Sequence, residues 1–401
     1  MGGPTTSNRR AIRLLAAGGL ISGLGDMAAI TALSYVIYRQ TGSAVWLGFV
    51  YVVNFGITGL LNPWAGALAD RLDRRLLQIA CELLSAGLFV ALALVSQPLA
   101  MVLIMLAASV VGAPILLAFA AAVPNLVRPE DLSWANSLVS MAGTVGRTVG
   151  PALGGLLVAV VGGRGVFAFD AATFVVLAGA TWLAKGRYVG EREGSDPEGR
   201  WSSLAGFWHI AASPILLPVV AAWTIMFFAV DIAFVADAPL AKLFGAGSLG
   251  FGLITSLWGV GAVLGALAAR RLSSRAEGVA LMAGTFGVTV GYALVAFARR
   301  FPMVLGGEVV AGFTDNYGGI AGTNVVQRTT PDAIRGRVFG AIGMAGMTAN
   351  IPAFLLGGLL VGPLGPRGVY LLGAALALPA GLVMLSGVRA LGRQPRAQLA
   401  R

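Results

Sequence analysis

Long apolar runs, separated by short polar segments, dominate this chain from end to end. A helix needs about 20 mostly apolar residues to cross the hydrocarbon core of a bilayer, and every run is long enough. The runs also lack the alternation of apolar and polar residues that strands of a membrane barrel show. The pattern therefore predicts an all-α membrane protein with twelve transmembrane helices, at residues 11–38, 44–69, 76–96, 99–127, 133–161, 165–184, 214–240, 248–269, 278–298, 302–327, 338–361 and 368–388.

The apolar pattern is interrupted by one longer charged segment, rich in Gly and Pro, after the sixth run. Such a composition is typical of a solvated linker. Its second part has apolar residues at helical spacing, which predicts a short amphipathic helix at the inner membrane interface. We therefore expect an N-terminal six-helix bundle (1–184), a cytoplasmic linker (185–213) and a C-terminal six-helix bundle with a cytoplasmic tail (214–401).

The two predicted bundles resemble each other at an offset of about two hundred residues. Gly154-Gly155-Leu156 matches Gly357-Gly358-Leu359, and Arg164-Gly165 matches Arg367-Gly368. Two pseudo-symmetric bundles around a site near the bilayer midplane are a known arrangement of secondary transporters. The repeat therefore favours a carrier that works by alternating access.

Basic residues are concentrated in alternate loops. The formal net charge is +11, and 21 of the 28 Lys and Arg residues fall in inner segments if both termini are cytoplasmic. This asymmetry follows the positive-inside rule and predicts a multi-pass protein of the cell membrane with both termini in the cytoplasm. Since topology accounts for the positive charge, we do not expect a nucleic-acid partner.

Residues suited to metal or catalytic chemistry are scarce. The single Cys81 excludes an intramolecular disulfide, and the single His209 excludes a paired-histidine metal site. Neither Lys185 nor Lys242 follows the glycine of a phosphate-binding loop, so an ATP-driven pump is not expected. We expect no enzyme, no metal and no bound cofactor, with the protonmotive force as the energy source.

The loop after the second predicted helix combines a glycine, two aspartates and several arginines. It resembles the signature loop of the major facilitator superfamily, although Asp73 stands where that family commonly has glycine. The resemblance implies a latch on the inner side, in which Asp70 meets the start of the eleventh helix. The latch residues that it implies are Gly66, Asp70, Arg71, Arg74, Arg75, Arg335 and Arg337.

The fifth predicted helix carries Gly146, Gly150, Pro151, Gly154 and Gly155. Glycines four residues apart share one helix face and admit another backbone closely, while a proline bends the span. The full pattern resembles the motif of exporters and antiporters in the same superfamily, which favours export over import.

A wider resemblance, to the branch that contains enterobactin and macrolide exporters, covers residues 10–385. It includes Thr41-Gly42-Ser43-Ala44 and Pro124-Asn125-Leu126-Val127. The resemblance departs in the fourth helix, where residues 112–122 contain no arginine or acid. Many proton-coupled relatives have a basic residue there, so coupling by that route is not implied.

Ionisable residues within the apolar runs are candidates for function, because a charge at the bilayer centre costs about 2.5–3.5 kcal/mol even on lenient scales. The proton-coupling candidates are Asp26, Arg147, Asp231, Glu308 and Asp315. An acid that Arg147 approaches and leaves during transport would gain and lose a proton, which is a mechanism for antiport. In the alternative interpretation, Arg147 and Asp26 form a structural ion pair, and Asp315 with Asn316 binds water or substrate. For Glu82, Asp170 and Asp237 we expect interfacial or latch roles.

The substrate cavity is expected to be apolar and aromatic, with a few polar groups that orient the ligand. The candidates are Tyr35, Tyr51, Asn54, Trp223, Phe227, Trp258, Asn316 and Tyr317, although aromatic residues of membrane helices also face lipid.

Taken as a whole, the sequence predicts a secondary transporter that exports a small amphipathic molecule, such as a drug, siderophore or secondary metabolite, in exchange for protons. It is expected to act as a monomer whose partners are this substrate, protons and membrane lipid. The alternatives are a lipid or lysolipid flippase, a proton-coupled importer and, from a different class, a membrane enzyme that acts on lipid.

Overall fold

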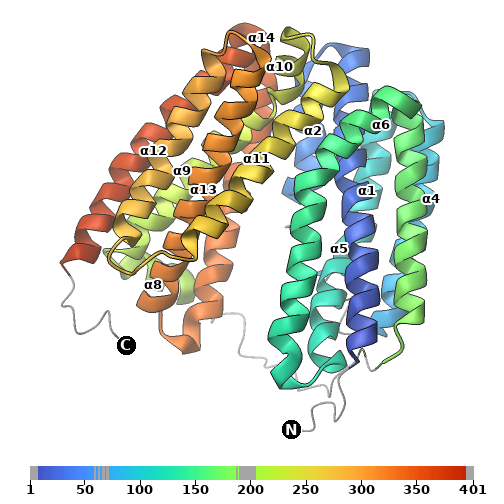
Figure 1. Cartoon of the computed structure of the whole chain (residues 1–401), viewed down its shortest axis with the longest axis horizontal. Helices are drawn as coiled ribbons and strands as arrows, with labels where there is room; N and C mark the ends of the chain where they lie inside the picture. The colour runs from blue at the N-terminus through green and yellow to red at the C-terminus, as the bar shows by residue number, and fades with distance from the viewer. Residues whose placement is uncertain are drawn as a thin grey trace. The chain divides into compact units, whose positions relative to one another are not determined.

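The computed structural model describes residues 8–57, 60–61, 64–65, 68, 72–186, 188 and 205–393. All regular structure in these ranges is helical. The elements are α1 (Arg9–Thr41), α2 (Ala44–Tyr51), η1 (Val52–Gly56), α4 (Arg74–Leu94), α5 (Pro98–Leu126), η2 (Pro129–Asp131), α6 (Leu132–Leu183), α8 (Ala205–Ala212), α9 (Leu216–Phe234), α10 (Asp237–Leu243), α11 (Gly247–Ala269), α12 (Glu277–Ala296), α13 (Phe301–Thr329) and α14 (Asp332–Gly392) (Figure 1).

Eight of the described helices are long and apolar enough to cross a membrane. Two of these, α6 and α14, are each two helices joined at a bend. A shorter apolar helix, Ala44–Gly56, consists of α2 and the single π-helical turn η1. Helix α13 has 29 residues and contains two acidic side chains. The described helices are consistent with the twelve expected spans and confirm the all-α membrane fold.

A glycine bends each of the two longest helices. Gly162 in α6 has φ 73° and ψ 170°, and Gly365 in α14 has φ 69° and ψ 167°. A positive φ is open to glycine but strained for residues with a Cβ atom. The two glycines have the same backbone conformation. They are also separated by the same number of residues as the sequence repeats. The two halves therefore use one type of hairpin. Figure 1 shows α6 as two limbs.

The chain divides into two compact units. The first unit contains residues 1–193 and 245–256, and the second contains residues 194–244 and 257–401. The start of α11 therefore groups with the N-terminal residues. Residues 187 and 189–204 lie outside the described part of the chain, so the predicted linker boundaries stay a prediction.

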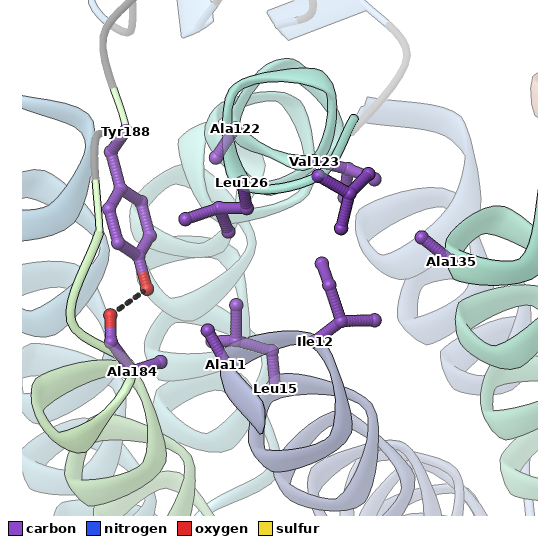
Figure 2. Close-up of a cluster of buried hydrophobic side chains, with 10 residues drawn as sticks. Ala11, Ile12, Leu15, Ala122, Val123, Leu126, Ala135, Ala184 and Tyr188 are labelled. Carbon is purple, nitrogen blue, oxygen red and sulfur yellow. Dashed lines mark hydrogen bonds between the residues drawn. The ribbon is translucent and has the colours of Figure 1, made fainter. Parts of the chain in front are cut away.

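One end of the first unit is closed by apolar side chains. Ile12 and Leu15 of α1 pack with Val123 and Leu126 of α5, and Tyr188 completes the cluster (Figure 2). The Tyr188 hydroxyl also donates a hydrogen bond of 2.9 Å to the carbonyl of Ala184, the C-cap residue of α6. The cluster thereby fixes the ends of three spans relative to one another.

Charged side chains surround this end of the first unit. Arg9 donates to the buried carboxylate of Asp131 at 2.7 Å, and Arg128 approaches the same carboxylate at 3.5 Å. The guanidinium groups of Arg9 and Arg13 also lie over the Trp134 ring, 5.4 and 6.0 Å from its centroid. Helix ends outside the hydrocarbon region can hold such charges, and here they join α1 to the start of α6.

The described part of the predicted amphipathic helix is α8, in the second unit. Ile210 is 5% exposed and packs in a cluster with Leu216 and Val338, whereas Trp208 is 73% exposed. Gly206 lies against the backbone carbonyl of Arg337, at a position where a Cβ atom would overlap it. One face of α8 is therefore covered by protein and the other is open.

Candidate transport sites

A cavity of about 400 Å³ lies inside the first unit, between α1, η1, α4, α5 and α6. Most of its wall is apolar and includes the rings of Phe55, Phe89, Phe119 and Phe174. Pockets of this kind, apolar with a few polar groups, are typical of sites for small molecules. The polar side chains on the wall are Ser22, Asp26, Asn54, Gln78, Glu82, Ser85, Ser109 and Thr181.

Asp26 is the acid that α1 contributes to this cavity, and it is half-buried. The adjacent Gly25 is packed so closely against Asp170 and Thr173 of α6 that a Cβ atom there would overlap the Asp170 carboxylate. Asp170 is fully buried, accepts a hydrogen bond of 2.8 Å from Thr173 and interacts electrostatically with Asp26. Two carboxyl groups that share a poorly hydrated site do not both ionise readily. Charge on Asp26 is therefore opposed by charge on Asp170.

Helix α4 contributes a second polar group of side chains to the cavity. Glu82 is 1% exposed and accepts a hydrogen bond of 3.3 Å from Thr181. Its other carboxyl oxygen, the Gln78 Oε1 atom and the Ser85 hydroxyl are buried and have no hydrogen-bond partner among the described residues. Buried polar atoms are normally paired, so this part of the wall has hydrogen-bonding capacity left for a ligand or water.

The side chains of Glu82, Asp170 and Asp237 are buried. They are 1%, 0% and 2% exposed, respectively. Their positions along the helices did not show this burial, because position along a helix does not show which way a side chain points. The interfacial or latch roles expected for them stay a prediction.

Arg147 on α6 is exposed. Among the described residues, no ion pair joins Arg147 to Asp26, so the structural ion pair considered for them is not present in this structure. Instead, the Arg147 guanidinium lies beside Gly143 of the same helix. One of its nitrogens is 3.4 Å from the position that a Cβ atom on Gly143 would occupy. A part for Arg147 in proton coupling stays a prediction.

In the second unit, Asp231 of α9 and Asp315 of α13 are half-buried and interact electrostatically. The side-chain amide of Asn350 on α14, with its nitrogen facing Asp231, donates to Asp231 Oδ2 at 2.8 Å and to the Gly346 carbonyl at 2.6 Å. The sequence did not point to Asn350, because a single amide in an apolar run forms no recognisable pattern.

Glu308 has a partner from another helix that the sequence did not predict. It is 3% exposed and lies 2.7 Å from the hydroxyl of Tyr370 on α14. The same hydroxyl lies 2.5 Å from a carboxyl oxygen of Asp237 on α10. Two acids and one tyrosine from three helices therefore meet in the interior of the second unit.

The substrate-cavity candidates of the first unit differ in position. Asn54 lines the cavity and its amide donates to the Val50 carbonyl at 2.8 Å. Tyr51 is 1% exposed, with its ring centroid 6.2 Å from that of Phe55, and is not part of the cavity wall. Tyr35 is half-buried and is likewise absent from the wall.

Two aromatic candidates of the second unit pack against glycines. The Trp223 ring fills the space beside Gly322 of α13, where a Cβ atom would overlap it. Phe227 lies against Gly346 of α14 and is 42% exposed. Each ring therefore has one face on protein, and neither position by itself assigns a ligand.

The remaining candidates have contacts within the second unit. Asn316 donates to the Ala262 carbonyl at 2.9 Å, which ties α13 to α11. Tyr317 stacks on Phe313 with ring centroids 6.0 Å apart. The Trp258 indole nitrogen is buried and has no hydrogen-bond partner in the described ranges. The Trp258 N–H is therefore available as a donor.

The latch implied by the resemblance is only partly visible, because three of its members lie outside the described residues. Arg74 donates to the Tyr188 carbonyl at 3.3 Å, and Arg75 donates to the carbonyls of Thr181, at 3.2 Å, and of Trp182. These arginines therefore tie the start of α4 to the end of α6. The residues outside the described part are Gly66, Asp70 and Arg71.

On the other side of the predicted latch, Arg335 forms an ion pair with Asp332 and approaches the Thr330 carbonyl at 3.5 Å. Arg337 is exposed. A contact between either arginine and Asp70 stays a prediction.

The glycine-rich stretch of α6 packs against α1. A Cβ atom on Gly146 would lie 3.0 Å from the backbone of Gly23, and one on Gly154 would lie 2.6 Å from the Cα atom of Ala28. Gly150 is in similar contact with Met27. Glycine is therefore required at these positions because the two backbones touch.

The same stretch of α6 also packs against the first part of α11. The Ser248 hydroxyl donates to the Gly155 carbonyl at 2.9 Å, and the backbone N–H of Ala152 donates to the Ser256 hydroxyl at 2.9 Å. Gly252 lies against the Pro151 carbonyl, where a Cβ atom would overlap it. The exporter-like motif thus serves as a packing surface on two sides of its helix.

These features define a class of protein: a multi-pass helical membrane carrier with acidic and amide side chains inside its helix bundles. The profile of the Major Facilitator Superfamily matches residues 15–277 and 228–399. The chain belongs to this superfamily and is a transporter, not an enzyme.

Individual relatives agree with this assignment. The chain is 25% identical over 410 residues to the multidrug efflux pump Tap of Mycolicibacterium fortuitum, which covers 96% of both chains. It is also 25% identical over 403 residues to the uncharacterized MFS-type transporter YfiS of Bacillus subtilis strain 168, covering 96% of this chain and 94% of that one. A bacterial homolog of the human lysosomal transporter Spinster, in an inward-facing and unoccupied conformation, shares the fold with a TM-score of 0.76 at 14% identity, covering 98% and 99% of the two chains.

Proposed function

We propose that this transporter exports a small amphipathic molecule, such as a drug, siderophore or secondary metabolite, in exchange for protons. The observation that carries the proposal is the first-unit cavity, whose apolar and aromatic wall is interrupted by Asp26 and by unpaired polar atoms of α4. Such a wall suits a ligand with an apolar body and a polar or positively charged end.

Two further points support export. The chain is similar to a protein named as a multidrug efflux pump. The glycine and proline pattern of residues 146–155 resembles the motif of exporters and antiporters. The distribution of Lys and Arg favours a cell-membrane protein with both termini in the cytoplasm. The proposed carrier acts as a monomer without a bound cofactor.

Asp26 is the group that links substrate to proton in this proposal. As a carboxylate it attracts the positive end of an amphipathic cation, while the aromatic side chains of the wall hold the apolar part. A proton that enters from the outside removes this charge and releases the ligand. Each charge that moves through 100 mV supplies about 2.3 kcal/mol.

The first experiment is a susceptibility and accumulation screen. Cells that overproduce the protein are compared with empty-vector cells over a panel of fluorescent amphipathic dyes and antibiotics, with and without an uncoupler. Proton-coupled export predicts lower accumulation of at least one compound and loss of this effect with the uncoupler. Uptake of a solute by right-side-out vesicles made acidic outside would instead indicate import. A change in phospholipid asymmetry without a change in drug susceptibility would indicate lipid transport.

The second experiment tests Asp26 with a compound from that screen. Asp26→Asn removes the ionisable group with little change of shape, and we expect it to abolish proton-driven extrusion from everted vesicles while the protein stays folded. Glu130→Gln is the matched control, because the Glu130 side chain is 65% exposed. Unchanged extrusion by the Asp26→Asn variant would refute the role given to Asp26.

A further inference from the structure

The interior of the second unit contains a carboxyl–tyrosine–carboxyl arrangement. Tyr370 Oη lies 2.5 Å from Asp237 Oδ1 and 2.7 Å from Glu308 Oε1. The three residues are 1%, 2% and 3% exposed, respectively. They belong to α14, α10 and α13, so this one hydroxyl joins three helices.

A count of hydrogens shows what this geometry requires. The phenol has one hydrogen and can donate it to only one of the two carboxyl groups. An ionised carboxylate is an acceptor only, so the second short oxygen–oxygen distance needs another hydrogen, and only the second carboxyl can carry it. With that hydrogen, one carboxyl donates to the phenol oxygen and the phenol donates to the other carboxylate. Both contacts are then ordinary hydrogen bonds.

The charged and titratable groups around this arrangement are mostly acidic. The Tyr292 ring of α12 meets the Tyr370 ring edge-on, with centroids 5.2 Å apart and an interplanar angle of 85°. Asp231 and Asp315 act electrostatically on Tyr292, as Asp237 and Glu308 do. A second ionised carboxylate among these groups would be repelled by them.

The basic residue one turn before Tyr370 on α14 is directed to other contacts. Arg367 donates to the Ala298 carbonyl at 2.7 Å and lies over the Phe244 ring, 5.3 Å from its centroid.

We propose that Asp237, Tyr370 and Glu308 form a proton-binding site in the second unit, separate from Asp26, in which the two carboxyl groups share one proton through the phenol. Release of this proton leaves two carboxylates and one phenol hydrogen, so one of the two hydrogen bonds breaks. Loss of that bond weakens the contact of α10 or α13 with α14. Proton occupancy of the site is independent of the transported molecule, whereas its use in transport rests on the proposed function.

Infrared spectroscopy of the purified full-length protein in lipid nanodiscs tests this occupancy without any substrate. Protonated carboxyl groups have a C=O stretching band that ionised carboxylates lack and that shifts in D₂O. We expect the wild-type protein to show such a band at neutral pH. Glu308→Gln and Asp237→Asn should each lose the intensity of one carboxyl group, because the remaining acid can then ionise and accept from the phenol. Tyr370→Phe keeps both acids, so it should retain a band at a shifted frequency.

Asp332→Asn is the matched control, because the Asp332 side chain is 87% exposed in the same half of the chain. The proposal is overturned if Glu308→Gln, Asp237→Asn and Asp332→Asn all give the wild-type spectrum in this region. Size-exclusion profiles identify any variant that does not fold, and Tyr370→Phe then carries the test alone, with an unshifted band as the contrary result. Since no transported compound is used, a negative result here is distinct from failure of proton-coupled export.

Discussion

The close contact between α6 and α1 makes Gly154 the position where a small substitution should have a large effect. In Gly154→Ala, the new Cβ atom would lie 2.5 Å from the carbonyl oxygen and 2.6 Å from the Cα atom of Ala28. Carbon atoms prefer separations of about 3.5–4.0 Å, so the two backbones must move apart by about 1 Å. The atoms that are struck belong to a helix backbone, which cannot rotate away. We therefore expect an overpacking cost of about 1–3 kcal/mol.

Gly179→Ala is the matched control for this substitution. Gly179 also lies in α6, and nothing lies within 4 Å of the position that its Cβ atom would occupy. Both variants gain helix propensity of about 1 kcal/mol on replacing glycine by alanine, so their difference isolates the packing cost. A cost of about 2 kcal/mol corresponds to a decrease of roughly 4–8 °C in melting temperature for a domain of 150–250 residues.

The assay is thermal unfolding of the purified protein in detergent. Size-exclusion chromatography after heating measures the fraction of protein that stays folded. Gly154→Ala should melt several degrees below Gly179→Ala. Equal melting temperatures for the two variants would show that α1 and α6 do not touch at Gly154, and the packing role given to the glycine-rich stretch would fail with it.

Three further predictions concern other parts of the molecule. Asp131→Asn removes the ion pair with Arg9. Because the Asp131 side chain is only 7% exposed, we expect a loss of about 1–2 kcal/mol in the free energy of unfolding. Glu130→Gln is again the exposed control and should melt as the wild type does. Burial raises the pKa of Tyr188 to about 12. The folded state therefore holds this proton more tightly than the unfolded chain, in which the pKa is about 10, and this stabilisation is lost as pH rises through 12. The melting temperature of the wild type should accordingly fall more steeply between pH 10 and 12 than that of Tyr188→Phe, and parallel curves would contradict the assignment. Asn350→Ala removes a hydrogen bond to the Asp231 carboxyl. If this bond supports coupling at Asp231, proton-driven efflux should fall about tenfold, as expected for a bond worth about 1.5 kcal/mol. An unchanged rate would show that the Asn350 bond has no part in coupling.

The architecture was predictable because span length and apolar composition are properties of the sequence alone. The expected break between residues 161 and 165 coincides with the bend at Gly162, and the repeat located its counterpart at Gly365. Close packing of the 146–155 stretch was predictable for a similar reason, since four-residue spacing of glycines fixes a common helix face.

Partners of the polar side chains were not predictable in the same way. Tyr370 and Asp237 are 133 residues apart in the chain, and nothing local to either indicates the other. Glu308 was a candidate because it is an acid within an apolar run, but its contact with Tyr370 depends on how α13 packs, which the sequence does not show. Gln78 and Ser85 were missed because an uncharged polar residue in an apolar run is common and becomes informative only when its buried atoms are found without partners.

The π-helical turn in the second span has a genetic consequence. A π-helical turn contains one residue more than the corresponding α-helical turn, and in η1 this extra residue occurs where Asn54 and Phe55 form part of the cavity wall. Deleting one codon between positions 52 and 56 would let the span become a regular α-helix. The residues before and after the deletion would keep their directions around the helix axis. Such a shortened allele would reshape the binding chamber without introducing a foreign side chain, which no point substitution can do.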